Sequence, residues 1–223
     1  VNHLASTVRP DLATAVSFLS SVDKDNYTQA DLDDALRVAK FLSKPEKEVG
    51  ISYDGSKFAT PEEAIQPTLY VDSDHKKSGD FKSRSGYVVY ICGAPVCWRS
   101  QLQKTIATSS TEAEIIAASD AGKRVLWVRS LMKELGFSLP PTVVHEDNQA
   151  CLALVQGTAV SDRSRHIDVR YWWVRELRDR GIISWQYIKT ENNVADFFTK
   201  RLSVKDQVRY MAKLCVPYDH GLG

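Results

Sequence analysis

The sequence lacks several features that would mark a special class of protein. Its four cysteines form no CxxC pair and no metal-ligand spacing, so we expect reduced thiols in a cytosolic or nuclear setting. No apolar run approaches the roughly 20 residues that a membrane helix needs, so we expect no membrane partner. The N-terminus lacks the apolar stretch of a signal peptide, so we expect none. The chain starts at Val1 without an initiator Met, which suits a fragment of a longer chain.

The sequence also has no excess of charge of either sign. The formal net charge is +1, so any nucleic-acid partner would have to be held by local basic patches. One such patch is predicted around a basic helix from about Asp168 to Arg180. Two interpretations remain open for it: a solvated face with acidic ion-pair partners, or a ridge that binds phosphates. The crowded arginines are Arg163, Arg165, Arg170, Arg175, Arg178 and Arg180. The candidates for nucleic-acid contact are Arg163, Arg165, Arg170 and His166, although a lone His is more often structural.

Two helices are predicted to open the chain. The first starts at Pro10, a favoured first helical residue, and runs to Val22. The second, Gln29–Ser43, follows Thr28 and has Asp31 three residues on, close to a capping box. This pair is too small to be a stable domain alone, so we expect its apolar stripes to dock on a part of the protein outside this chain.

The remainder predicts an α/β fold. Short apolar runs predict strands, and longer periodic runs between them predict helices. The predicted strands are Thr68–Asp72, Gly86–Ile91, Val96–Arg99, Thr142–Glu146 and Ile182–Ile188. The predicted helices are a long one from about Thr111 to Leu135, one after Asn148, the basic helix, and a last one over Val194–Arg201. This order predicts a mixed five-stranded sheet flanked by helices, with an N-terminal helical segment.

The pattern divides the chain into four parts. Residues 1–56 form the helical segment, and residues 57–67 form a polar linker with proline breakers. Residues 68–202 form the α/β domain, and residues 203–223 form a C-terminal tail.

Four carboxylates occupy special places in this order: Asp72, Glu114, Asp147 and Asp196. Each lies at the end of a predicted strand or in the first turn of a predicted helix. Strand ends and helix starts at one edge of an α/β sheet are where ligands bind. Converging carboxylates would repel each other unless cations lay between them, and Mg²⁺ prefers such oxygen ligands. Spacing alone does not separate this hypothesis from ordinary caps and turn residues.

The residues around these carboxylates carry a family resemblance. Six blocks, in order, resemble the ribonuclease H domain of copia-type LTR retrotransposons. They are Tyr70–Asp74, Lys82–Tyr87, Gln103–Glu114, His145–Ala150, Arg165–Tyr171 and Asn193–Lys200. A further block, Thr7–Ala13, resembles the family's segment after the polymerase palm, so residues 1–56 correspond to a thumb-like or connection-like end of reverse transcriptase.

The resemblance implies an endoribonuclease that cuts the RNA strand of RNA–DNA hybrids. Asp72, Glu114, Asp147 and Asp196 take its catalytic, metal-binding positions for two Mg²⁺ ions, for which Mn²⁺ can substitute. Ser110, Thr111 and Gln149 fall where relatives contact the hybrid, whose 2′-hydroxyls suit short polar side chains. The implied partners are the hybrid and the polymerase domain of the same Pol polyprotein. The implied location is a cytoplasmic virus-like particle, or the nucleus.

Two departures keep an alternative open. His75 stands where the family usually has Trp, and Lys189–Asn193 lacks the His that cellular ribonucleases H carry before the last aspartate, as is general in the copia family. The alternative is an inactive or domesticated remnant that only binds nucleic acid. An integrase shares the fold, but its acidic order is Asp, Asp, Glu, and here Glu114 precedes Asp147.

Overall fold

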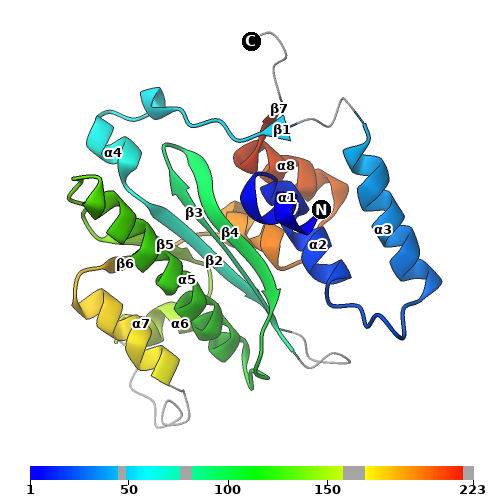
Figure 1. Cartoon of the computed structure of the whole chain (residues 1–223). Helices are drawn as coiled ribbons and strands as arrows, with labels where there is room; N and C mark the ends of the chain where they lie inside the picture. Colours follow the sequence, from blue (N-terminus) through cyan, green and yellow to red (C-terminus); the bar gives the residue numbers. More distant parts are fainter. Residues whose placement is uncertain (45–48, 76–81, 158–168, 218–223) are drawn as a thin grey trace.

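A mixed sheet forms the centre of the molecule (Figure 1). The computed structural model describes residues 1–44, 49–75, 82–157 and 169–217. The sheet has five strands in the order β4-β3-β2-β5-β6. The strands β2, β3 and β4 pair antiparallel, whereas β5 runs parallel to both β2 and β6. Their bounds are β2 Thr68–Asp74, β3 Arg84–Ile91, β4 Ala94–Leu102, β5 Thr142–Glu146 and β6 Ile183–Tyr187. The predicted α/β class and five-stranded mixed sheet flanked by helices are confirmed.

Each face of the sheet has its own core, because successive strand side chains point to opposite faces. Leu69, Val71 and Val144 pack into a core under the helices α5 (Ser110–Glu134), α6 (Gln149–Val155) and α7 (Val169–Asp179). Val88 and Trp98 pack into a second core on the other face. That core includes the 3-10 helix η6 (Val194–Phe198) and the helix α8 (Val204–Leu214). The sheet is therefore covered on both sides.

Several element boundaries differ from the prediction. The expected helix Pro10–Val22 is a 3-10 turn, η1 (Pro10–Leu12), followed by α2 (Ala13–Leu19), and α1 (Asn2–Thr7) precedes them. The helix α3 (Gln29–Leu42) has the predicted capping box between Thr28 and Asp31. The expected last helix, Val194–Arg201, is the short η6.

The linker and tail are more structured than predicted. Within 57–67 lies α4 (Pro61–Ile65), since Pro61 sits at a first-turn position where its missing N–H breaks no helical hydrogen bond. Within the expected tail lies α8, which Ser203 caps and which buries Tyr210 and Leu214 against the sheet. A short two-stranded sheet pairs β1 (Val49–Gly50) with β7 (Val216–Pro217).

The N-terminal segment docks on the sheet of its own chain, so the expectation that both of its helices wait for an outside partner was wrong for α2. The Trp98 indole N–H donates to the carbonyl of Ala5 at 2.7 Å in a buried contact. The guanidinium of Arg84, a buried residue of β3, lies 3.9 Å from the ring centroid of Phe18. The apolar stripe of α2 is thus used within the chain.

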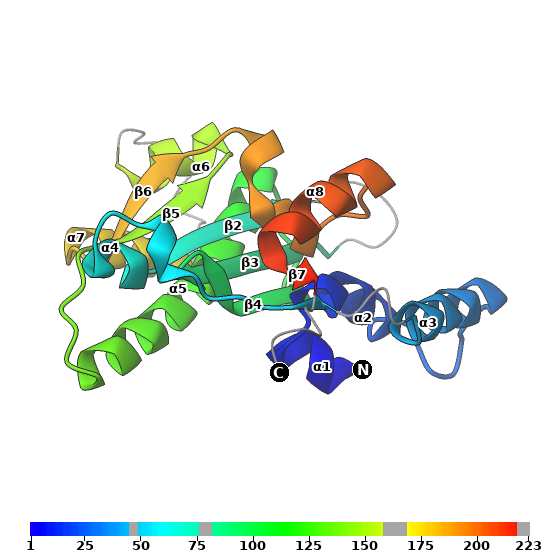
Figure 2. The same ribbon diagram turned by 90° about the horizontal axis from the view of Figure 1, so that it is seen from above.

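The helix α3 behaves differently from α2. It lies at the margin of the molecule in both views (Figures 1 and 2), and it contacts α2. Its residues Leu32 and Leu36 are 43% and 54% exposed.

None of the described helices is long and apolar enough to cross a membrane.

We predict that Leu12→Ala destabilises the whole chain. Leu12 is 3% exposed and packs with Ala5 and Val16, so its truncation should lower the free energy of unfolding by about 2–4 kcal/mol. The matched control is Leu36→Ala on α3, where exposed truncation should change it by less than about 0.5 kcal/mol. Chemical denaturation followed by tryptophan fluorescence measures both. Two separate unfolding transitions would contradict docking of the N-terminal segment on the sheet.

Candidate metal centre

Three aspartates meet at one edge of the sheet. Asp72 lies on β2, Asp147 follows β5 directly, and Asp196 lies on η6. One carboxylate oxygen of each lies within 4.8 Å of the others. The strands β2 and β5 are parallel neighbours, so their carboxyl ends meet at the same edge. The structure therefore brings together three of the four carboxylates named from the sequence.

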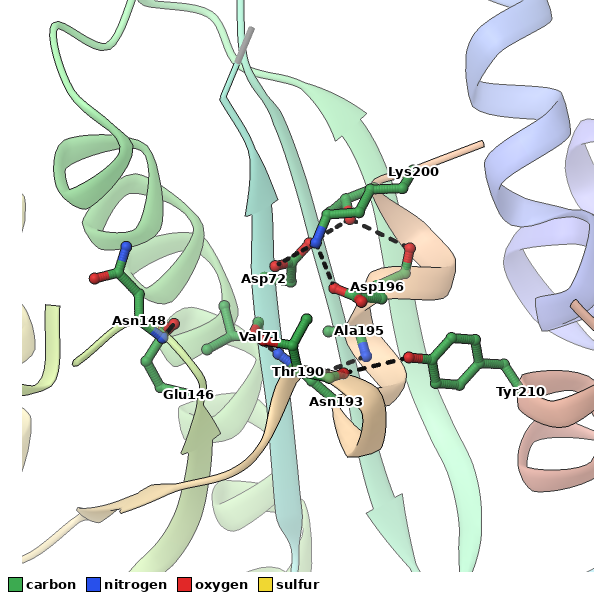
Figure 3. Close-up of polar contacts among 11 residues, drawn as sticks. Val71, Asp72, Glu146, Asn148, Thr190, Asn193, Ala195, Asp196, Lys200 and Tyr210 are labelled. Atoms are coloured by element: carbon green, nitrogen blue, oxygen red, sulfur yellow. Dashed lines mark hydrogen bonds and ion pairs between the residues drawn. The ribbon is translucent and has the colours of Figure 1, made fainter. Parts of the chain in front are cut away.

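Asn193 ties Asp196 to this edge. Its side-chain carbonyl accepts a hydrogen bond from the Ala195 N–H at 3.1 Å and so caps η6. Its amide group donates to the Val71 carbonyl at 2.9 Å. Asn193 is fully buried, and Val71 immediately precedes Asp72 (Figure 3). One side chain thus fixes the loop that carries Asp196 against the strand that carries Asp72.

The absence of a side chain at Gly86 brings η6 close to the sheet. Gly86 is the cross-strand partner of Asp72 in the register of β2 and β3. A Cβ at this position would lie 2.6 Å from Thr199 Cγ2 and 2.7 Å from Phe198 Cβ. Any larger residue would therefore push η6 and the following turn away from Asp72.

Lys200 supplies the positive charge of the site in this structure. Its ammonium lies 2.6 Å from Asp196 Oδ1 and 3.4 Å from Asp72 Oδ1 (Figure 3). The Thr199 hydroxyl donates to the other oxygen of Asp72. Sequence reasoning missed both residues as site residues, although they close the block in which Asp196 was found. A helical step of four from Asp196 to Lys200 was the available signal.

Two glutamates lie beside the aspartates. Glu114, the fourth carboxylate named from the sequence, is 4% exposed in the first turns of α5. Its oxygens are outside the close group of three, but the charges of Asp72 and Asp147 reach it. Glu146, which sequence reasoning missed, is fully buried at the end of β5. Its signal was a second carboxylate directly before Asp147.

Burial and mutual repulsion make these groups hard to ionise. The pKa of Asp72 is raised to about 7: burial raises it most, the charge of Lys200 lowers it, and the charge of Asp196 raises it. Burial also raises the pKa values of Glu114 and Glu146, and neighbouring carboxylates add to it. Burial lowers the pKa of Lys200, but the charges of Asp72 and Asp196 outweigh it and raise that pKa. Among the described residues, Lys200 pairs with two of these acidic groups, and the others have no such counter-charge.

These residues fit a divalent cation. The three aspartate oxygens already lie close enough together to share an ion. Glu114 Oε2 and Glu146 Oε2 are buried and have no hydrogen-bond partner among the described residues. Carboxylate oxygens are the ligands that Mg²⁺ and Mn²⁺ prefer, and a cation would offset the repulsion.

Four of the residues expected to contact a hybrid lie at the starts of helices in the described part of the chain. Ser110 and Thr111 open α5 one turn before Glu114, and Gln149 opens α6 directly after the Asp147 turn. Arg170, at the start of α7, donates to Thr105 Oγ1 at 3.2 Å in the loop before α5. The other three expected contacts, Arg163, Arg165 and His166, lie outside the described residues.

Comparison with known proteins gives relatives among transposon polyproteins. The chain is 40% identical over 134 residues to the retrovirus-related Pol polyprotein from transposon TNT 1-94 of Nicotiana tabacum, covering 59% of this chain and 10% of the relative. It is 32% identical over 209 residues to that from transposon RE2 of Arabidopsis thaliana, covering 91% and 14%. A shorter relative, secreted RxLR effector protein 161 of Plasmopara viticola, is 34% identical, covering 57% and 85%. The chain thus spans a small part of the plant polyproteins.

Among solved structures, the chain is similar to LC11-RNase H1, isolated from compost. The match is 14% identical with a TM-score of 0.47, and it covers 60% of this chain and 93% of the other. The same protein in complex with an RNA/DNA hybrid matches at 13% identity and a TM-score of 0.46. No family model matches the chain.

We predict that Lys200→Met destabilises the protein in the absence of metal. It leaves Asp72 and Asp196 without their counter-charge, so the free energy of unfolding should fall by about 1–3 kcal/mol. This is less than for a fully buried pair, because the Lys200 side chain is 35% exposed. The control is Lys123→Met, which removes an exposed pair with Asp120 and should cost less than about 0.5 kcal/mol. Equal losses in both variants, measured in chelator, would contradict the role of Lys200.

The raised pKa of Asp72 predicts a pH dependence of metal-free stability. Folded Asp72 holds its proton up to about pH 7, whereas an ordinary aspartate releases it near 3.8. Its contribution is therefore fully present below pH 3.8 and is lost as pH rises towards 7. Asp72→Asn should gain stability relative to wild type across this window, by on the order of 1 kcal/mol or more.

Thermal melts in chelator at pH 4 to 8 measure this gain. The control is Asp120→Asn on α5, which should show no such trend. A difference between Asp72→Asn and wild type that stays constant over the window would rule out the pH dependence.

Proposed function

Since this chain belongs to the copia-type, retrovirus-related Pol polyproteins, we propose that it is a ribonuclease H that cuts the RNA strand of RNA–DNA hybrids. The observation that carries the proposal is the meeting of Asp72, Asp147 and Asp196 within 4.8 Å. These residues come from distant parts of the chain, and each lies in a block that resembles the nuclease of this family. The ribonuclease H-type role is thereby supported by the site as well as by the relatives.

Asp72, Glu114, Asp147 and Asp196 are the residues that would hold two Mg²⁺ ions, with Mn²⁺ as a substitute. Such ions activate water and stabilise the leaving oxygen of a phosphodiester. The chain's own contribution is to hold the carboxylates in place. Thr199 and Asn193 fix the two sides of the site by hydrogen bonds, so little reorganisation is needed when the cations bind.

Substrate binding would use the polar rim of the same edge. Ser110 and Thr111 are placed at the start of α5, and Gln149 at the start of α6, where short polar groups can meet 2′-hydroxyls. Arg170 adds a positive charge next to the loop before α5. If this chain works within a Pol polyprotein such as its relatives, a polymerase there would hold the same duplex and raise the local concentration of the hybrid.

We predict that Asp147→Asn abolishes cleavage and keeps hybrid binding. The wild type should cut a labelled RNA–DNA hybrid with Mg²⁺ and leave it intact with chelator. Removal of a ligand carboxylate should lower the rate by at least about two orders of magnitude, more than the 10–100-fold typical of outer-shell changes. Gel assays of product and fluorescence anisotropy of binding measure the two effects.

The matched control is Asp120→Asn, whose carboxylate pairs with Lys123 away from the three aspartates. It should cut at the wild-type rate, and double-stranded DNA should remain uncut by all forms. Wild-type protein that binds the hybrid without cutting it in Mg²⁺ or Mn²⁺ would replace the proposal with the non-catalytic binding remnant.

A further inference from the structure

Glu146 is a buried carboxylate that the four-residue site does not use. It is the last residue of β5 and is fully buried. Because strand side chains alternate, Glu146 lies on the same face as Val144, whose side chain belongs to the core beneath α5. Glu114 is carried by α5 itself. The two glutamates therefore lie between the strand and the helix that covers it.

The contacts of the two glutamates leave each with an unsatisfied oxygen. Glu146 Oε1 accepts a hydrogen bond from the Asn148 backbone N–H at 2.9 Å. Glu146 Oε2 and Glu114 Oε2 are buried, and neither has a hydrogen-bond partner among the described residues. Lys200 makes its two ion pairs with Asp72 and Asp196. Within the part of the chain that the structure describes, neither glutamate forms an ion pair with a lysine or arginine.

A third buried group lies in the same part of the interior. Cys151, on α6, is fully buried. Burial raises the pKa of its thiol, and the charges of Glu146 and Glu114 raise it further. Two buried carboxylates without a counter-charge would be strongly unfavourable here.

We propose that Glu146 is a fifth carboxylate of the metal centre, which with Glu114 holds a divalent cation on the α5 side of Asp72. A cation at this place satisfies the two free oxygens and offsets the repulsion between the glutamates. The inference rests on the proposed function, because it takes the aspartate cluster to be a metal site. It goes further by assigning a ligand charge to Glu146 and a side of the site to one ion.

The test is a titration of the protein with Mn²⁺ alone. Calorimetry measures the heat of binding, and electron paramagnetic resonance measures the free Mn²⁺. The variants are Glu146→Gln and Glu146→Ala. The control for charge near the site is Glu112→Gln, since Glu112 is a half-buried carboxylate in the first turn of α5 that accepts hydrogen bonds from Thr108. Glu146→Gln keeps the shape and an acceptor for the Asn148 N–H. It should lower the affinity for one Mn²⁺ ion by about tenfold or more. It should also reduce the rise in Tm on Mn²⁺ addition and leave metal-free Tm unchanged or higher.

Three results separate the possibilities. Mn²⁺ isotherms of both folded Glu146 variants that superimpose on wild type would overturn the inference, even if the wild type cuts hybrids. Wild-type protein that binds no Mn²⁺ would overturn it together with the metal-dependent nuclease. Tighter Mn²⁺ binding by wild type than by Glu146→Gln, without hybrid cleavage, would support the inference and reject the proposed function. If one variant does not fold, as judged by circular dichroism, the other decides.

Discussion

The repulsion between buried carboxylates is the constraint around which this structure is organised. Asp72 is 2% exposed and Asp196 is 6% exposed, and their oxygens approach each other and Asp147 within 4.8 Å. Water cannot screen charges in such a place, so opposite charge or protons must. Lys200 provides part of the compensation, and the raised pKa of Asp72 shows that it is incomplete. A site with several converging carboxylate oxygens is well suited to hold divalent cations.

The fold forces the acids together in spite of this repulsion. The parallel pairing of β2 and β5 brings two strand ends to one edge of the sheet. Asn193 and Gly86 then hold η6 against β2, the first by buried hydrogen bonds and the second by leaving room. The two hydrophobic cores on either face of the sheet lie outside the acidic cluster. Their stability can therefore offset the unfavourable electrostatics of the centre.

The N-terminal segment belongs to this structural unit. Trp98 on β4 donates a hydrogen bond to the Ala5 carbonyl, and Arg84 on β3 donates one to the Ser17 hydroxyl oxygen. Thr14 likewise donates to the Phe197 carbonyl, in the helix that carries Asp196. The segment that resembles the end of a polymerase is therefore in contact with the loop that positions a site residue. These hydrogen bonds link the N-terminal segment physically to the candidate metal centre.

The sequence alone determined the class of fold, the five strands and the carboxylates at their ends, because apolar periodicity and ordered local motifs are properties of short segments. The motifs around Asp72, Asp147 and Asp196 also identified the family. Tertiary structure decided what depends on contacts between distant segments. The docking of α2, the burial of α8, the ion pairs of Lys200 and the burial of Glu146 all belong to this group. The sequence pattern of an acid beside a strand end is the same whether its side chain is solvated or buried, so only the packing of the folded chain decides between the two. Burial matters because a charged carboxylate without water needs a counter-charge or a proton.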